Sequence, residues 1–292
     1  MNQGKFTPQH TEDGSYTFFS EEFQETFHSS FGAKQEAEVR YIEPCLIKQL
    51  ALQQSTIRLL DICYGLGYNS AAALEAIWSV NPQCRVELIA LEISADVPQQ
   101  AVKHNLLAPW EFPIPELLAE LSNKFKVTRE LFQAKLLLGD ARHTIHPLIR
   151  KNWQANAVFL DPFSPPKCPQ LWTVEFINLV AQCLQPHGRL ATYSCAAAVR
   201  IALLSAGLNI TSITGAGRKS PGTLATLEDT QKYKKTHPLS VREEEHLKTR
   251  AAIPYRDRTL EATAAQIIHN RQQEQQISSL EATSQWRKRW FR

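Results

Sequence analysis

The 292-residue sequence has no apolar run of about 18 residues, the length that a membrane-spanning helix requires. Its first residues, MNQGKFTPQHTEDGSY, lack the apolar core of a secretory signal peptide. Neither sign of charge dominates, because 32 Lys and Arg residues stand against 29 Asp and Glu residues, for a formal net charge of +3. We therefore expect neither a membrane protein nor a secreted one, and any nucleic-acid-binding surface must come from local clusters of charge.

Metal-ligand and disulfide spacings are missing as well. The six cysteines, at positions 45, 63, 84, 168, 183 and 195, form no CxxC pair and no Cys/His cluster with zinc spacing. Scattered cysteines in apolar surroundings are typical of reduced residues in a cytosolic protein. These patterns predict a cytoplasmic protein without a metal centre.

What the sequence does contain is an alternation of strand and helix patterns from about residue 36. Short apolar runs predict buried strands at 57–65, 85–94, 135–145 and 155–163, and stretches with helical spacing lie between them. A Pro-His-Gly turn is expected at 186–188. The alternation predicts an α/β fold, a Rossmann-like and mostly parallel sheet with helices on both faces.

Composition suggests three segments. Residues 1–35 are polar with spaced aromatics, which favours an N-terminal extension that packs on the rest of the protein. The α/β domain would occupy residues 36–258. Residues 259–292 form a charged C-terminal tail that ends in WRKRWFR, and either a frayed terminus or a tail that contacts RNA would explain it.

The segment LLDICYGLGYNS places glycines at a turn from strand to helix. Gly65 and Gly67 would let the backbone turn sharply and approach a ligand, next to the free N–H groups at the start of a helix. The preceding strand carries Asp61 near its end. A dinucleotide fingerprint requires a third glycine where this sequence has Ser70, which disfavours NAD.

Two further strands end in an acid, as expected for a nucleoside site. Glu92 follows Gly67 by 25 residues and could accept both hydroxyls of a ribose. Asp140, next to Ala141, could accept the amine of an adenine, although an aspartate there would equally cap a helix. The acids and the GxG turn together are typical of a site for S-adenosyl-L-methionine, although NAD would present the same groups.

The stretch LDPFSPPKCPQLW at residues 160–172 follows the fourth predicted strand. Its Asp-Pro-Phe resembles the [DN]-P-P-[FYW] loop of amino-methyltransferases, and the whole stretch resembles the loop of MnmC-like tRNA methyltransferases. Similar matches occur in DGSYTFFSEEFQETFHSSFGAKQEA, LLDICYGLGYNSAAAL, GRLATYSCAAAVRIALLSAGLNI, GRKSPGTLAT and PYRD. Together these segments span roughly residues 13 to 257. The sequence differs from the family pattern at Cys168, where Asn is frequent, and at Arg258, where Pro is usual.

The resemblance implies a Rossmann-like enzyme that uses S-adenosyl-L-methionine to methylate 5-aminomethyl(-2-thio)uridine at the wobble position of tRNA. Asp161 would then aim the amine. Phe163 and Trp172 could stack on the base or belong to the loop core. Lys167, Arg218 and Lys219 could hold phosphates. Glu36 matches a family position near the cofactor. In some bacteria this domain is fused to a flavin-dependent oxidase, whose fingerprint does not follow here, so a separate upstream enzyme is expected to make the aminomethyl group.

Two other classes of function stay open at this point. A polyamine-synthase-like aminopropyltransferase or a methyltransferase of small amines would share the fold and a related nucleotide. A non-catalytic RNA-binding module would share the basic tail. The acids and glycines of the predicted site are all present, however, which argues against an active site that has lost its function. Lys167 and the GRK turn favour a large anionic substrate over a free amine.

Overall fold

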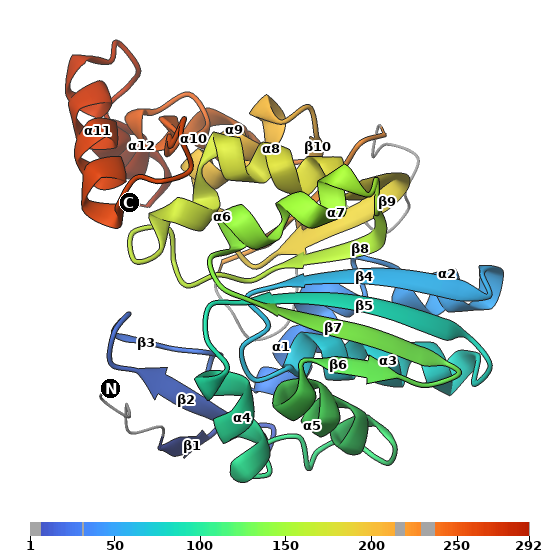
Figure 1. The fold of residues 1–292 in the computed structure, drawn as a ribbon. Coiled ribbons are helices and arrows are strands. Elements are labelled where there is room, and N and C mark those ends of the chain that lie inside the picture. The colour runs from blue at the N-terminus through green and yellow to red at the C-terminus, as the bar shows by residue number, and fades with distance from the viewer. Residues whose placement is uncertain (1–6, 31, 214–219, 229–236, 292) are drawn as a thin grey trace.

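The computed structural model describes residues 7–30, 32–213, 220–228 and 237–291. An eight-stranded sheet in the order β10-β11-β9-β8-β4-β5-β7-β6 forms its centre (Figure 1). The strands are β4 (Thr56–Ile62), β5 (Arg85–Glu92), β6 (Lys126–Thr128), β7 (Phe132–Leu138), β8 (Ala155–Leu160), β9 (Leu184–Thr192), β10 (Asn209–Ile213) and β11 (Gly222–Thr226). The strands β7, β5, β4, β8 and β9 pair in parallel, which confirms the predicted fold class.

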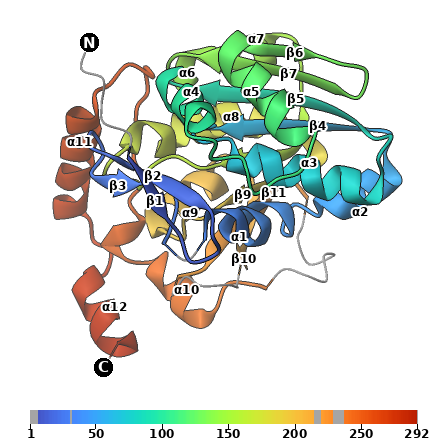
Figure 2. The same cartoon turned by 90° about the horizontal axis from the view of Figure 1, so that it is seen from below.

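Helices cover both faces of this sheet (Figures 1 and 2). The helices are α1 (Ala33–Ala37), the π-helix η1 (Glu38–Ile42), α2 (Ile47–Gln53), α3 (Tyr68–Val80), α4 (Asp96–Lys103), α5 (Ile114–Lys124), α6 (Ala141–Thr144), α7 (His146–Arg150), the 3-10 helix η2 (Pro169–Trp172), α8 (Val174–Gln182), α9 (Ala197–Ser205), α10 (Val241–His246), the 3-10 helix η4 (Arg250–Ala252), α11 (Ala264–Ile277) and α12 (Thr283–Trp290). None of the helices in the described ranges is long and apolar enough to cross a membrane.

The burial of each strand reflects how many of its faces are covered. Every residue of β8 is buried, because this central strand lies between two layers of helices. In β4, Leu59 packs into the core formed with α3 and α5, and the next residue, Leu60, packs into the core formed with α8 and α9. In β7, near the sheet edge, buried and exposed residues alternate instead, so one face of the sheet is open there.

The N-terminal segment forms a separate three-stranded antiparallel sheet of β1 (Pro8–His10), β2 (Tyr16–Ser20) and β3 (Glu25–Thr26). In Figure 1 this small sheet lies near the carboxyl ends of the central strands. Phe18 is fully buried in the main core. The N-terminal strands are therefore packed against the α/β domain at the edge where ligands of such sheets bind.

Two local predictions were wrong. The expected Pro-His-Gly turn lies inside β9, where the pairing with β8 shifts between Ala155 and Ala157, so that the extra residues around Pro186 bulge from the ladder. The C-terminal residues are not a frayed tail but form α11 and α12. Trp286 of α12 is buried, and its indole N–H donates to the Arg242 carbonyl at 3.1 Å.

Candidate active site

A cavity of about 1200 Å³ lies at the carboxyl ends of β4, β5, β7 and β8. This exceeds the volume of most ligand sites, which is about 300–1000 Å³, so two ligands have room to meet there. Residues 19–28 of the N-terminal segment line its outer side. Eight of the lining residues are acidic, namely Glu21, Glu22, Glu25, Glu36, Glu92, Asp96, Asp140 and Asp161, against two cations, Arg142 and Lys167. The cavity therefore favours positively charged groups.

The turn between β4 and α3 has the tight geometry predicted from its glycines. Gly65 has φ +55° and lines the cavity. Gly67 has φ +82°, and a Cβ atom there would lie 2.6 Å from the Tyr64 hydroxyl oxygen, so any larger residue would adopt a strained backbone conformation and displace the buried Tyr64 side chain. Gly67 thus shapes the turn, whereas Gly65 forms part of the wall.

Glu92 ends β5 and is 8% exposed, with its carboxylate in the cavity wall. Oε2 accepts the Gly65 N–H at 2.9 Å, and Oε1 accepts the Ile93 N–H at 2.8 Å. Burial raises the pKa of Glu92, and these backbone hydrogen bonds oppose that rise. The remaining lone pairs of this buried carboxylate can accept hydrogen bonds from the hydroxyl groups of a ribose. This wall of the cavity therefore fits a nucleoside, such as the one in S-adenosyl-L-methionine.

Asp140 caps a helix, which is one of the two roles that the sequence left open, and it also lines the cavity. Its carboxylate caps α6 by accepting the Arg142 N–H at 2.9 Å, and both Asp140 and Ala141 line the cavity. Burial alone would raise the pKa of Asp140, but the hydrogen bonds and charge of Arg142 lower it below its usual value. Arg142 also donates to Asp257 at 2.8 Å, which gives the aspartate of the PYRD segment a structural role that the sequence did not reveal.

Asp61 lies beneath the cavity rather than in its wall, which corrects its predicted contact with the cofactor. Its side chain is fully buried, and Oδ2 accepts the Ser70 hydroxyl at 2.6 Å. Asp61 therefore ties the end of β4 to the first turn of α3. Burial, followed by the charges of Asp161 and Glu92, raises the pKa of Asp61 to about 8, although the Ser70 hydrogen bond opposes this.

The raised pKa of Asp61 predicts a pH-dependent stability. Between pH 4 and 8 the folded state holds a proton on Asp61 that the unfolded state has lost, so the free energy of unfolding should fall as pH rises. At about 1.4 kcal/mol per pKa unit, up to about 4 kcal/mol would be lost between pH 5 and 8. Asp61→Asn should flatten this slope in urea titrations at pH 5, 6, 7 and 8. The same slope in both proteins would show that Asp61 does not titrate in this range.

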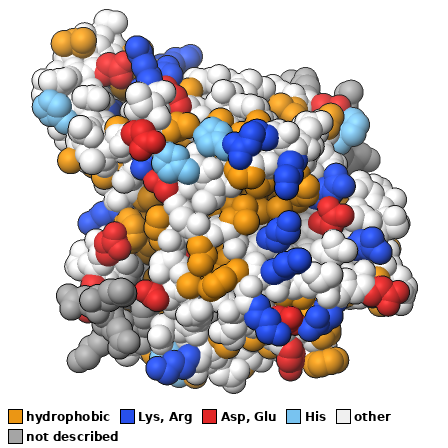
Figure 3. Space-filling model, in the orientation of Figure 1, with side chains coloured by type: hydrophobic (Ala, Val, Ile, Leu, Met, Phe, Trp, Pro, Cys, Tyr) orange, Lys and Arg blue, Asp and Glu red, His pale blue; other side chains and the backbone are white. Residues whose placement is uncertain are grey.

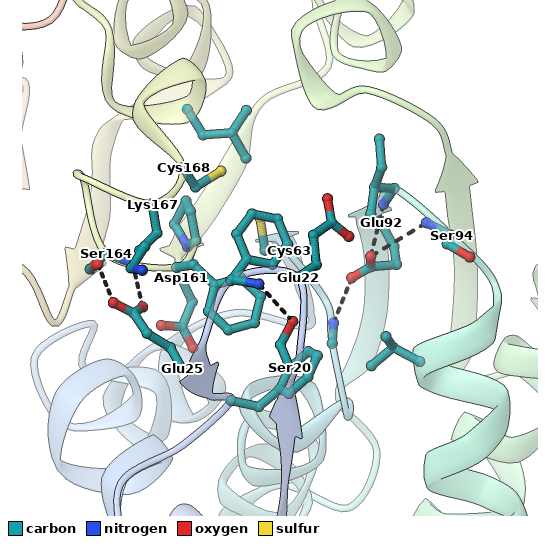
Figure 4. A pocket seen from close by; sticks show the side chains of 18 of the residues that line it. Ser20, Glu22, Glu25, Cys63, Glu92, Ser94, Asp161, Ser164, Lys167 and Cys168 are labelled. Atoms are coloured by element: carbon teal, nitrogen blue, oxygen red, sulfur yellow. Dashed lines mark hydrogen bonds between the residues drawn. The ribbon is translucent and has the colours of Figure 1, made fainter. Parts of the chain in front are cut away.

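The acceptor end of the cavity is formed by the loop after β8. Asp161 lines the cavity, and its Oδ2 accepts the Asn69 side-chain N–H at 2.9 Å. Figure 4 shows Asp161 and Glu92 on opposite sides of the cavity. Burial, followed by the charge of Asp161, raises the pKa of Tyr41 well above that of an exposed tyrosine, so a neutral hydroxyl stays against this carboxylate.

The N-terminal segment holds this loop through residues that we did not predict. Glu25 of β3 accepts the Ser164 N–H at 3.0 Å and the Ser164 hydroxyl (Figure 4). The ring of Phe23 stacks on Phe163 with centroids 4.3 Å apart, and Phe27 contacts Phe163 edge-on at 5.0 Å. The spaced aromatics of residues 16–31 were a signal of packing, but their partner across some 140 residues could not be read from the sequence.

The other predicted residues fall into three groups. Phe163 and Lys167 line the cavity, as does Glu36, whose Oε2 accepts the Ser29 N–H at 3.0 Å. Trp172 is fully buried, and its indole N–H donates to the Phe163 carbonyl at 2.9 Å, so it supports the loop and cannot stack on a base. Arg218 and Lys219 lie outside the described residues. Within those residues no group of three or more His, Cys, Asp or Glu side chains could hold a metal ion.

Comparisons with known proteins give the family of the chain. Residues 98–228 match a family described as S-adenosyl-L-methionine-dependent methyltransferase. An uncharacterised protein of Methanocaldococcus jannaschii is 32% identical over 270 residues, which cover 90% of this chain and 70% of that protein. The crystal structure of MnmC2 from Aquifex aeolicus is similar with a TM-score of 0.79 and 32% identity, over 93% of this chain and 85% of that one.

A further similarity is partial. The tRNA 5-methylaminomethyl-2-thiouridine biosynthesis bifunctional protein MnmC of an Acidovorax species is 28% identical over 225 residues, 74% of this chain. The match covers 34% of that protein. The chain thus spans about a third of the length of the bifunctional relatives that it matches.

Proposed function

This chain belongs to the MnmC2-like family of S-adenosyl-L-methionine-dependent methyltransferases, and we propose that its acceptor is the primary amine of 5-aminomethyluridine, with or without 2-thiolation, at the wobble position of tRNA. The observation that carries the proposal is the placement of Asp161 in the same cavity as Glu92, on opposite sides. A carboxylate at the acceptor end suits an amine, and Glu92 suits the ribose of the cofactor.

S-adenosyl-L-methionine supplies an electrophilic methyl group on a sulfonium. The acceptor nitrogen must offer a free lone pair to it. An alkyl amine with the pKa of lysine is neutral in only about one molecule in 10³ at pH 7. Since the cavity is rich in carboxylates, which stabilise the ammonium form, the chain must bind the amine first and release its proton within the site.

We infer that Asp161 performs the binding and aiming. Its carboxylate can accept a hydrogen bond from the amine and pass the proton to water, while Asn69 fixes the carboxylate orientation at 2.9 Å. Tyr193 supports the same loop, because its hydroxyl donates to the Pro162 carbonyl at 2.9 Å. Phe163, in the cavity wall, offers a ring for the uracil, and Lys167 offers a cation for a flanking phosphate.

The contact between Glu25 and Ser164 gives a test of the acceptor loop. Glu25→Gln should lower kcat/KM for tRNA about tenfold, since a hydrogen bond to a charged group contributes about 1.5–3 kcal/mol, while cofactor affinity stays within about twofold. Steady-state methylation and calorimetric titration measure the two effects. Glu21→Gln removes a neighbouring exposed carboxylate of the same cavity and is the matched control. Equal kinetics for both variants would contradict a role for Glu25 in placing the loop.

The proposed function is tested with the purified protein and tRNA that carries 5-aminomethyluridine. Methyl transfer from labelled S-adenosyl-L-methionine should convert this nucleoside to 5-methylaminomethyluridine, detected by nucleoside mass spectrometry. Unmodified tRNA should accept no methyl group. Label on any other nucleoside, or none on the aminomethyl form, would refute the proposal. The substrate also requires a prior reaction that installs the aminomethyl group on uridine.

A further inference from the structure

The cavity cannot attract an RNA backbone by its charge. Eight acidic residues line it against Arg142 and Lys167, and Arg142 is already paired with Asp140 and Asp257. Phosphates that approach this opening meet a net negative potential. If the substrate is tRNA, most of the electrostatic binding energy has to come from cations outside the cavity.

Such cations gather on the open face of the sheet edge. Lys126 of β6 and Lys135 of β7 are direct partners across the antiparallel pair, so their side chains share one face. Both are exposed, and neither forms a salt bridge within the described residues. Like charges placed directly opposite each other destabilise a sheet. An anion bound between them would remove this repulsion.

Other cations extend this surface. Lys124 and Arg129 lie on either side of Lys126 in the sequence and both pair with Glu120. Arg150 and Lys151, at the end of α7, are exposed. Figure 3 shows Lys and Arg side chains in a band over α7, β7 and β6 in the orientation of Figure 1. We call the six residues Lys124, Lys126, Arg129, Lys135, Arg150 and Lys151 the basic face.

The basic face is connected to the cavity by a single strand. From Lys135, β7 continues to its last residue, Leu138, and the next residues, Gly139 and Asp140, line the cavity. At about 3.3 Å per residue, Lys135 lies about 13 Å of backbone from Gly139. A nucleic acid of a few nucleotides spans this distance, so one tRNA can place a base in the cavity and phosphates on the basic face.

We propose that the basic face binds the sugar–phosphate backbone of the tRNA whose modified base enters the cavity. The proposal rests on the proposed function for the identity of the RNA. A lysine on an edge strand, such as Lys126 on β6, also prevents edge-to-edge pairing with another sheet, and a lysine that serves this purpose alone would have no effect on RNA binding. The two explanations therefore predict different results for the same variants.

The test compares two double variants that change the net charge equally. Lys126→Ala/Lys135→Ala should weaken tRNA binding about tenfold near 0.15 M salt and lower the slope of log K against log salt by about two, one for each lost phosphate contact. Its melting temperature should not fall, because the repulsion between the two lysines is removed. Lys48→Ala/Lys248→Ala removes two exposed cations outside the basic face, on α2 and after α10, and should bind tRNA with the affinity of the unchanged protein.

Methylation rates on two substrates distinguish a failure of the basic-face proposal from a failure of the proposed function. The Lys126→Ala/Lys135→Ala protein should methylate the free nucleoside 5-aminomethyluridine, which has no phosphate, at the normal rate, and its KM for whole tRNA should rise about tenfold. Unchanged tRNA affinity and salt slope in this variant would overturn the proposal, as would an equal loss in the Lys48→Ala/Lys248→Ala variant. Should the unchanged protein bind tRNA through the basic face without methylating it, only the proposed function fails.

Discussion

The Asp161→Asn enzyme should retain S-adenosyl-L-methionine affinity within about twofold and lose about 10²–10³-fold in kcat. Asparagine keeps the shape of the side chain but removes the charge that binds the amine and the oxygen that can receive its proton. The loss is in turnover because Asp161 lies at the acceptor end of the cavity, across from Glu92. Single-turnover methylation of aminomethyl tRNA measures the rate, and calorimetry measures cofactor binding.

A control for Asp161 comes from the same cavity. Glu22→Gln also removes one carboxylate from the wall, but Glu22 is exposed and belongs to the segment between β2 and β3. This variant should turn over within about twofold of the unchanged enzyme. Normal turnover by Asp161→Asn would refute the assignment of Asp161 as the residue that binds and aims the amine.

Glu92→Ala should raise the Kd for S-adenosyl-L-methionine about 100-fold or more. Two hydrogen bonds from ribose hydroxyls to a charged acceptor contribute about 1.5–3 kcal/mol each, and 1.4 kcal/mol corresponds to a factor of ten. The Gly65 and Ile93 N–H groups lose their acceptor as well. Binding is therefore measured by calorimetry at a temperature where circular dichroism shows the variant to be folded.

Glu87→Ala provides the comparison on the same strand. Glu87 faces away from the cavity and pairs with Arg58 at 2.9 Å. Since this ion pair is partly exposed, its loss should cost little stability and leave the Kd for the cofactor unchanged. Equal affinities for the Glu92 and Glu87 variants would contradict the ribose site at Glu92.

The parts of the site that the sequence predicts are those set by local pattern. Glu92, Asp140 and Asp161 each follow an apolar run, and the ends of neighbouring parallel strands meet at one edge of a sheet. Gly65 is placed by the turn that follows β4. Strand periodicity and glycine spacing are local properties of the sequence. They therefore predict which residues stand at the strand ends without any knowledge of distant contacts.

The contacts that the sequence did not predict depend on residues far apart in the chain or on how side chains pack within one loop or turn. Phe163 and Trp172 stand in one loop, and only packing decides that Trp172 is buried and Phe163 lines the cavity. Asp61 turns inward because Ser70 of α3 comes within reach of its carboxylate. Glu25 reaches Ser164 across 139 residues, a pairing that no local pattern encodes.

The order of the strands has a consequence for how the protein assembles. β4 and β8 are neighbours although their paired residues Leu59 and Ala157 lie 98 positions apart in the sequence. Closing so long a loop is entropically costly and makes folding slow. Asp161 follows β8 directly, so the amine-binding half cannot join the nucleotide half until that closure is complete. Methyl transfer would thus begin only in chains that have docked β8, and its onset in a refolding experiment would time that step.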